Sequence, residues 1–557
     1  MRRHPVFFIQ NLITVSLLLL LTFPVFASFS PKRISLSSPL YDQVDALYRL
    51  EGLARPSDAR PWSNEEAAQI IKKLPDSLKT RHFKEKTLSL LEKTLKSTAG
   101  DDFSYRISTT VALEAYAHTN MDDFIILEDW IFGGDERKPL LNFRMEAQFG
   151  TIFYFGTSIE AGIGLYTRSD ITEDIADENI GIILPASTSV IGHVTWSELY
   201  HRLFSTNAIT ADTQFYANWP NNSQITLGSN WWNVSMARGA IRWGNGKSGD
   251  LVIGGHINLQ NTLRFDFFSN GFKMELLYLF LEDHEDEVNQ RIFMGRRFEF
   301  EPFTRLRATI TENVMYRGPS LEMKYLNPTS IYHNYYNSEK FNSIASLEIN
   351  FAPCKGFSLY GQFALDQYQM SNETDSVANA MGRLIGAEYS WLSKEGIFST
   401  SMEYVLTDPS LYRRDKINFL LYRGLKNNGD PYVFDYLGYQ YGSDSQVLRF
   451  DLSYLRACTF KTNFTATVLQ QGEVGMYYAI GDTDTTYANI LSSAPSGDTI
   501  RQKLILGLQG TWWPAFAPAA LYGQINWIGK RTFTRSTEQI SDREKDLQLI
   551  LGVSFTF

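Results

Sequence analysis

A glycine-rich run at residues 238–250 holds the side chains of this sequence that are best suited to contact a ligand. It opens with two arginines, Arg238 and Arg242, at the end of a segment with strand-like alternation. We expect both to line the inside of a barrel and to have acidic partners there, as buried or partly buried arginines usually do. Acids such as Glu275 and Glu348, on other expected strands, are the predicted partners.

Trp243, Asn245 and Asn258 lie in the same region, and we expect them at the outer end of the barrel. There a tryptophan offers a sugar ring a stacking surface, and a polar side chain offers hydrogen bonds. The alternative, which we favour from the residues alone, is that Trp-Gly-x-Gly only shapes a tight outer loop, because glycine allows positive φ angles. Asn327, which precedes a proline, is likewise either a ligand residue or the start of a turn.

No specific catalytic or nucleotide-binding motif accompanies these residues. Residues 246–248 match the end of a phosphate loop, but Gly244 falls at the wrong spacing and a strand, not a helix, is expected to follow. The sequence has neither G-x-S-x-G nor H-E-x-x-H. The acidic run around His284 is a possible metal site, although a solvated loop is the favoured interpretation. We therefore predict no enzyme, no cofactor and no metal.

From Tyr105 onward, apolar and polar residues alternate with a period of two, which is typical of strands with one apolar face. Clear examples lie at 345–351, 357–365, 448–454 and 547–557. A soluble β-sandwich also alternates, but here short turns and long polar loops alternate as well, as in outer-membrane barrels. Inside a membrane, only a closed barrel pairs every backbone group of its strands. We predict an all-β fold, a transmembrane antiparallel β-barrel of about 18 strands at 105–557, in the outer membrane and its lipid bilayer.

The expected strands lie near 105–118, 141–149, 152–166, 223–229, 231–242, 260–269, 272–282, 303–313, 319–326, 344–352, 357–368, 382–391, 397–406, 447–456, 461–471, 502–512, 521–528 and 547–557. Residues 170–222 then form a long outer insertion, in which Trp196 to Phe204 fit an amphipathic helix. Paired tryptophans at 231–232 and 512–513 fall near turns, where an aromatic girdle is expected.

The N-terminal residues have a different character. Residues 1–27, with basic residues before an apolar stretch, are expected to be a cleaved signal peptide, because the stretch is short for a membrane anchor. Residues 31–99 are expected to form a small periplasmic helical segment, in which Ser63 and Glu66 make a capping box. The net charge of −9 argues against a nucleic-acid partner.

The final strand ends in Phe557 and resembles the signal that bacterial barrel-assembly machinery recognises, so that machinery is an expected partner. The two cysteines, Cys354 and Cys458, fall at different predicted turns separated by several strands. We expect both to be free thiols, because a disulfide needs Cα atoms within about 7 Å.

Several short motifs resemble the capsule assembly Wzi family. They are the Arg-Gly-x-x-Arg-Trp-Gly-x-Gly pattern at 238–246, Ser-Pro-Leu-Tyr at 38–41, Gly-Leu at 52–53 with Arg-Pro-Trp-Ser at 60–63, and Tyr-Leu-Asn-Pro at 325–328 with Tyr-His-Asn at 332–334. The resemblance implies an outer-membrane barrel, with a helical periplasmic part, that helps hold capsular or related polysaccharide. Surface polysaccharide is then the expected ligand. The resemblance adds His333 to the candidate ligand residues Arg238, Arg242, Trp243, Asn245, Asn258 and Asn327.

Three functions remain open at this point. The first is non-catalytic binding and retention of surface polysaccharide. The second is a porin-like channel, because a barrel of about 18 strands is wide enough to conduct unless loops fill it. The third is an outer-membrane enzyme, because a catalytic triad assembled in space leaves no sequence motif.

Overall fold

The computed structural model describes residues 30–95, 103–124, 129–131, 137–163, 202–208, 215–218, 220, 222–257, 260–281, 289–327, 331–332, 340–367, 379–412, 417–423, 433–456, 459–474 and 493–557. The predicted signal peptide and most of the predicted insertion at 170–222 lie outside these residues. No helix in the described ranges is long and apolar enough to cross a membrane.

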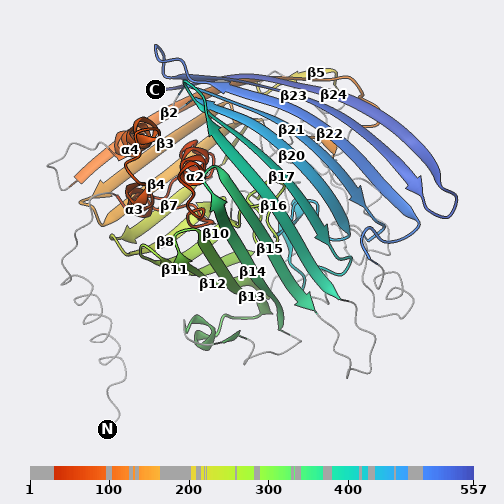
Figure 1. Ribbon diagram of the computed structural model, residues 1–557, viewed down its shortest axis with the longest axis horizontal. Coiled ribbons are helices and arrows are strands. Elements are labelled where there is room, and N and C mark those ends of the chain that lie inside the picture. The colour runs from red at the N-terminus through yellow and green to blue at the C-terminus, as the bar shows by residue number, and fades with distance from the viewer. Residues whose placement is uncertain are drawn as a thin grey trace, which may run out of the picture.

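Eighteen antiparallel strands form a closed barrel, which confirms the predicted fold class (Figure 1). In chain order they are β2 (Phe103–His118), β3 (Leu141–Phe149), β4 (Phe153–Ile163), β7 (Ser223–Gly228), β8 (Trp232–Gly239), β10 (Gln260–Phe268), β11 (Phe272–Leu281), β12 (Gln290–Phe303), β13 (Leu306–Gly318), β14 (Phe341–Cys354), β15 (Phe357–Gln367), β16 (Ala380–Leu392), β17 (Ile397–Thr407), β20 (Ser445–Arg456), β21 (Phe460–Gln471), β22 (Thr499–Trp512), β23 (Ala519–Thr534) and β24 (Gln539–Thr556). The ring closes where β2 pairs with β24. The short strands β5 (Phe204–Thr206) and β6 (Phe215–Asn218) add to β2 and β4.

The strand count agrees with the prediction although individual elements differ. Strand β12 was not predicted, because the charged residues Arg296, Arg297 and Glu299 interrupt its apolar alternation. The strand predicted near 319–326 is wrong, since that segment is a loop with a short 3-10 helix, η5 (Met323–Leu326). The helix predicted over 196–204 is wrong at its end, where Phe204 begins β5, and its earlier part lies outside the described residues.

The outward face of the barrel is apolar. In β24, Leu549 and Leu551 are exposed, whereas Gln548 on the opposite face is buried in the interior. Trp231 and Trp512 are exposed next to short turns, where the sequence predicts an aromatic girdle. Contact with lipid tails requires such a face, and the alternation seen in the sequence supplies it.

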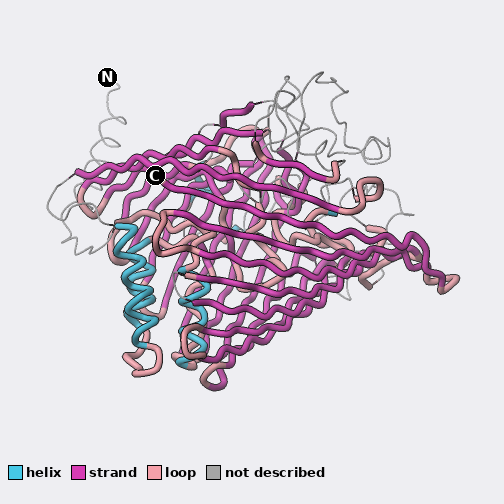
Figure 2. The backbone as a smooth tube through the Cα atoms, turned by 90° about the horizontal axis from the view of Figure 1, so that it is seen from above, coloured by secondary structure: helices cyan, strands magenta, loops and turns pink. Residues whose placement is uncertain are grey.

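Three helices lie at the end of the barrel where short turns join the strands, which we call the short-turn end (Figure 2). They are α2 (Leu40–Glu51), α3 (Asn64–Lys73) and α4 (Arg81–Leu95). Helix α2 stops at Gly52, whose φ of 70° is left-handed and suits glycine. On the barrel side, Arg49 of α2 donates to Glu388 Oε2 at 3.0 Å. The helices are thereby joined to the wall by buried polar contacts.

Only half of the predicted capping box forms at the start of α3. The hydroxyl of Ser63 accepts a hydrogen bond from the Glu66 backbone N–H at 3.1 Å. The Glu66 carboxylate turns away from the helix and lies 2.6 Å from Nζ of Lys273 on β11. A buried lysine in the wall therefore competes successfully for the carboxylate that would have completed the box.

Two long connections fold into the barrel interior. The first follows β8 and contains β9 (Arg242–Trp243); the second follows β17 and contains the hairpin of β18 (Leu420–Arg423) and β19 (Val433–Tyr436). Apolar side chains of both connections pack with inward-facing residues of the wall in one buried cluster. Strand β9 also pairs with β1 (Ala59–Arg60) of the N-terminal segment. Loops and the N-terminal segment therefore meet inside the barrel.

Candidate functional site

Trp243 and Asn245 do not lie at the outer end of the barrel, as the sequence analysis predicted. The connection that carries them folds inward, and both residues have no exposed surface. The indole N–H of Trp243 donates to Glu275 Oε1 at 2.8 Å. The Asn245 side chain accepts a hydrogen bond from Gln362 Nε2 at 3.2 Å. Their polar groups serve the packing of the loop, so no face of Trp243 is available for a sugar in this structure.

The predicted partners of the two arginines are also wrong. Glu275 pairs with Arg264 at 2.5 Å, and Glu348 pairs with Arg297 at 2.6 Å. The wall therefore does hold buried arginine–glutamate pairs, but other inward-facing arginines form them. Arg242 instead pairs with Asp250 of its own loop at 2.5 Å. Arg238 lies at the outer end of β8, where its Nη1 donates to Asn261 Oδ1 at 3.2 Å.

The remaining predicted ligand residues are not brought together with this loop. Asn327 follows η5 on the outer side of the wall, and its backbone oxygen accepts a hydrogen bond from Arg296 Nη2 at 2.7 Å. Asn258, His333 and the acidic run around His284 lie outside the described residues. Within the described ranges, no group of three or more His, Cys, Asp or Glu residues could hold a metal ion.

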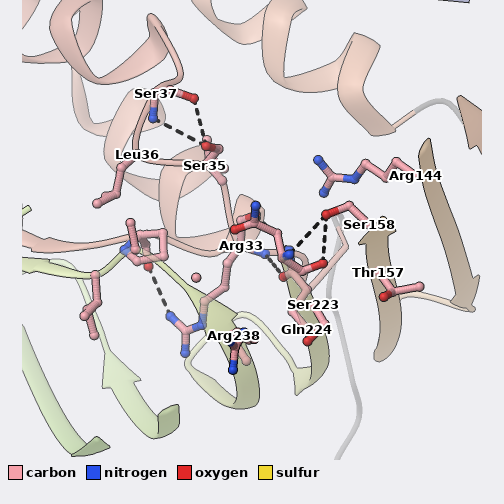
Figure 3. Close-up of a pocket in the computed structure, with 18 of the residues that line it drawn as sticks. Arg33, Ser35, Leu36, Ser37, Arg144, Thr157, Ser158, Ser223, Gln224 and Arg238 are labelled. Carbon is pink, nitrogen blue, oxygen red and sulfur yellow. Dashed lines mark hydrogen bonds between the residues drawn. The ribbon is translucent and has the colours of Figure 1, made fainter. Parts of the chain in front are cut away.

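A polar cavity of about 670 Å³ lies between the N-terminal segment and one side of the barrel wall. Its wall side chains come from β3, β4, β7, β8 and β10, and its other side is the stretch at 33–37 (Figure 3). The neutral polar residues that line it are Ser35, Ser37, Asn142, Thr157, Ser158, Asn222, Ser223, Gln224, Ser235 and Thr262. No described lining residue is aromatic. The described lining therefore offers hydrogen bonds and charge, but no aromatic ring for stacking.

Hydrogen bonds hold the N-terminal stretch against this wall. The backbone N–H of Arg33 donates to Gln224 Oε1 at 2.9 Å, and Nε of Arg33 donates to Ser235 Oγ at 2.8 Å. On the other side of the cavity, the backbone N–H of Ser158 donates to the oxygen of Asn222 at 2.7 Å. The cavity is therefore bounded on one side by the hydrogen-bonded N-terminal stretch and on the other by paired strands of the wall.

Of the predicted site residues that the structure describes, Arg238 alone lines this cavity. The sequence analysis missed the other lining residues, and part of them comes from positions that alternate along β3 and β4. Asn142 and Arg144, like Ser158 and Glu160, are polar residues two apart on strands that were correctly located. This polar alternation could have indicated that the inward face of β3 and β4 is polar. It does not show which part of the barrel interior remains unfilled by loops.

Comparison with solved structures agrees with this architecture over nearly the whole chain. Wzi, an outer-membrane protein involved in group 1 capsule assembly in Escherichia coli and described as a carbohydrate-binding β-barrel, is 12% identical, with a TM-score of 0.53. The match covers 94% of this chain and 99% of that one. The chain has the fold of an outer-membrane β-barrel. At such low identity, the likeness concerns the fold alone.

Other outer-membrane barrels give weaker matches. OprD of Pseudomonas aeruginosa is 9% identical over 81% of this chain and 94% of its own, with a TM-score of 0.39. In-vitro folded OmpT of Vibrio cholerae is 8% identical over 83% of this chain and 100% of its own, with a TM-score of 0.32. No family model and no curated protein matches the sequence of this outer-membrane barrel.

Proposed function

We propose that this outer-membrane barrel is a non-catalytic protein that binds and retains capsular or related surface polysaccharide. The observation that carries the proposal is the cavity, whose neutral lining consists largely of hydroxyl and amide groups suited to sugar hydroxyls. The likeness to a carbohydrate-binding barrel over the length of both chains supports it. Together with the short motifs that resemble the Wzi family, these features point to one class of ligand.

The predicted ligand residues take different parts in this proposal. Arg238 contacts the polysaccharide directly, because it lines the cavity. Arg242, Trp243 and Asn245 are positioning residues that hold the inward loop in place. Contact of Asn258, Asn327 and His333 with the polymer stays a prediction, as do assembly through the strand ending in Phe557 and a periplasmic role of the helices.

A porin-like channel is the second candidate, and the inward loops weigh against it. Trp243, Leu251 and Tyr439 of the two connections are buried in the interior cluster together with residues of the wall. A filled interior leaves little room for diffusion of solutes, even in a barrel of this width. For the enzyme alternative, the sequence offers no specific catalytic motif.

The proposal is tested with the full-length protein and with a strain that lacks it. We expect the deletion strain to lose surface polysaccharide and to release it into the medium, and we expect the wild-type gene to restore retention. Purified protein with Asn142→Ala and Asn222→Ala should bind the strain's polysaccharide at least tenfold more weakly. Asn463→Ala, on β21, is the matched control and should bind normally. Unchanged retention in the deletion strain would overturn the proposal.

A further inference from the structure

We propose that the cavity recognises an anionic group, a carboxylate or a phosphate, carried by the polysaccharide; this rests on the proposed function. Among the described lining residues six are cationic, and Glu160 is the one that is acidic. The six are Arg33, Arg137, Lys138, Arg144, Arg238 and Arg264. Buried cations are normally paired with acids. Because the described lining has six cations and one acid, an anionic ligand suits it better than a neutral one.

Two of these cations are neutralised by carboxylates of the neighbouring wall. Nη2 of Arg33 lies 2.6 Å from Asp266, and Nη2 of Arg264 lies 2.5 Å from Glu275. Neither carboxylate is part of the cavity lining. These two arginines are therefore held in place by partners outside the cavity and form a fixed, charged part of its wall.

Arg144 shares its acidic partner, Glu146, with other donors. Its Nε lies 3.2 Å from Glu146 Oε1, and the same oxygen also receives Nζ of Lys32 and the hydroxyl of Tyr154. One negative charge cannot neutralise two cations, so this group keeps a positive excess. The Arg144 side chain is 39% exposed and extends toward the cavity, as Figure 3 shows. Its guanidinium is therefore accessible to a ligand.

Two further cations of the lining, Arg137 and Lys138, lie near the outer ends of β2 and β3. Glu114 accepts the backbone N–H of Lys138 at 2.9 Å and the hydroxyl of Tyr522 at 2.5 Å. The ammonium of Lys138 lies 3.4 Å from the centre of the Tyr522 ring, and the guanidinium of Arg137 lies 4.1 Å from that of Tyr116. Aromatic faces thus supply part of the stabilisation of both cations, and the side-chain ammonium of Lys138 is held at the edge of the cavity that it lines.

Glu160 does not cancel this excess. Its Oε1 accepts hydrogen bonds from the amides of Asn142 at 2.9 Å and Asn222 at 3.5 Å. Among the described residues no cation forms an ion pair with it. The single acid of the lining is thereby occupied by neutral donors, and the cations remain as the charged surface that a ligand meets.

This arrangement suits an acidic saccharide. Charge-assisted hydrogen bonds from arginine and lysine to a carboxylate or phosphate are about twice as strong as neutral ones. The guanidinium of Arg144 can present two parallel N–H groups to such an anion. The volume of about 670 Å³ falls within the range of ordinary ligand sites, so a short segment of a glycan fits.

The experiment uses the full-length protein in detergent micelles and isothermal titration calorimetry. The probes are a trisaccharide of galacturonate, a neutral trisaccharide of galactose, and inorganic phosphate. The variants are Arg144→Gln and Lys138→Gln. Arg305→Gln is the matched control, because Arg305 lies at the short-turn end, where its side chain donates to the Pro353 oxygen at 3.1 Å and to no other described residue.

We expect the acidic trisaccharide to bind at least tenfold more tightly than the neutral one, and more weakly as salt is added. Each of R144Q and K138Q should weaken binding of the acidic trisaccharide about tenfold, and R305Q should leave this binding unchanged. Stronger binding of phosphate than of galacturonate would support a phosphate-bearing glycan as the source of the anion. Equal binding of both trisaccharides, or no binding of any anion, would overturn the inference. Anion binding in a protein whose deletion leaves surface polysaccharide intact would instead reject the proposed function and keep the anion site.

Discussion

The indole nitrogen of Trp243 lies 2.8 Å from Oε1 of Glu275, and this hydrogen bond joins the inward loop to strand β11 of the wall. Both side chains are fully buried. The same carboxylate also neutralises Arg264. The tryptophan is thus part of a buried charged network and holds the loop in the interior.

Trp243→Phe keeps most of the apolar contact but removes the hydrogen bond to the buried carboxylate. Loss of a hydrogen bond to a charged group costs about 1–3 kcal/mol. We expect the variant to lose its folded electrophoretic mobility at a lower temperature in detergent, with unchanged polysaccharide affinity. Weakened binding at unchanged stability would contradict the positioning role and would place a sugar on Trp243.

Removal of the inward loop should open the barrel. We expect a chain with residues 241–257 replaced by a short Gly-Ser linker to show larger conductance in planar bilayers than the wild type. The reason is that this loop contributes Trp243, Leu251 and Ile253 to the cluster that fills the interior. Shortening of the exposed β23–β24 turn at 535–538 is the control and should leave conductance unchanged. A wild-type conductance equal to that of the loop variant would favour the channel function.

Stability of the N-terminal segment should depend on the ionisation of Asp58. Burial raises the pKa of Asp58 to about 6, and the nearby Arg55 only partly opposes this. Because the pKa of Asp58 is raised in the folded state, Asp58 contributes fully to the free energy of unfolding below about pH 4. This contribution is lost as the pH rises through 6. Asp58→Asn cannot ionise. We expect it to be about 2 kcal/mol more stable than wild type at pH 8 and equally stable at pH 4.

Asp45→Asn is the matched control for that experiment, because its expected effect has the opposite sign. Burial opposes ionisation of Asp45, but Arg55 and Arg60 hold its pKa well below its usual range. Ionised Asp45 therefore contributes to the free energy of unfolding at neutral pH. This contribution is lost as the pH falls through the folded-state pKa of Asp45. Thermal unfolding in detergent at pH 4 and pH 8 measures both. Equal midpoints of Asp58→Asn and wild type at pH 8 would contradict the raised pKa.

The strands could be predicted because each outward residue must meet lipid and each inward residue the interior. That requirement acts on each residue separately, and it produces an alternating pattern in the sequence, as at Leu549 and Leu551. The site could not be predicted in the same way. Whether the loop carrying Trp243 points outward or inward depends on Ala59 and Glu275, which are distant in the chain. The stretch at 244–250, which is rich in glycine and polar residues, is as suitable for an exposed loop as for this buried one.

Strand β12 was not predicted for a related reason. Ile292, Met294 and Arg296 share the face opposite Phe293, which packs in the interior. An arginine facing lipid is unfavourable, so its presence argues against a membrane strand. Here the described residues of the connection after β13, 319–327 and 331–332, lie over the outer wall and are called the cover: the ring centre of Tyr332 lies 3.8 Å from the Arg296 guanidinium. This segment shields the charge of Arg296 from lipid. Because the segment is distant from Arg296 in the sequence, the shielding could not be predicted.

This relationship gives a prediction about the cover itself. Replacement of residues 319–339 by a short linker would expose Arg296 on the lipid-facing wall. An arginine facing lipid costs about 2–4 kcal/mol at the middle of the bilayer and less near its surface. We expect the truncated chain to unfold at lower urea concentration in phospholipid vesicles, and Arg296→Leu in that background to restore most of the loss. In the intact chain, R296L should instead be destabilising, because the Asn327 oxygen loses its donor. If R296L lowers stability equally in both backgrounds, the cover does not shield the charge, and the strand tolerates Arg296 for another reason.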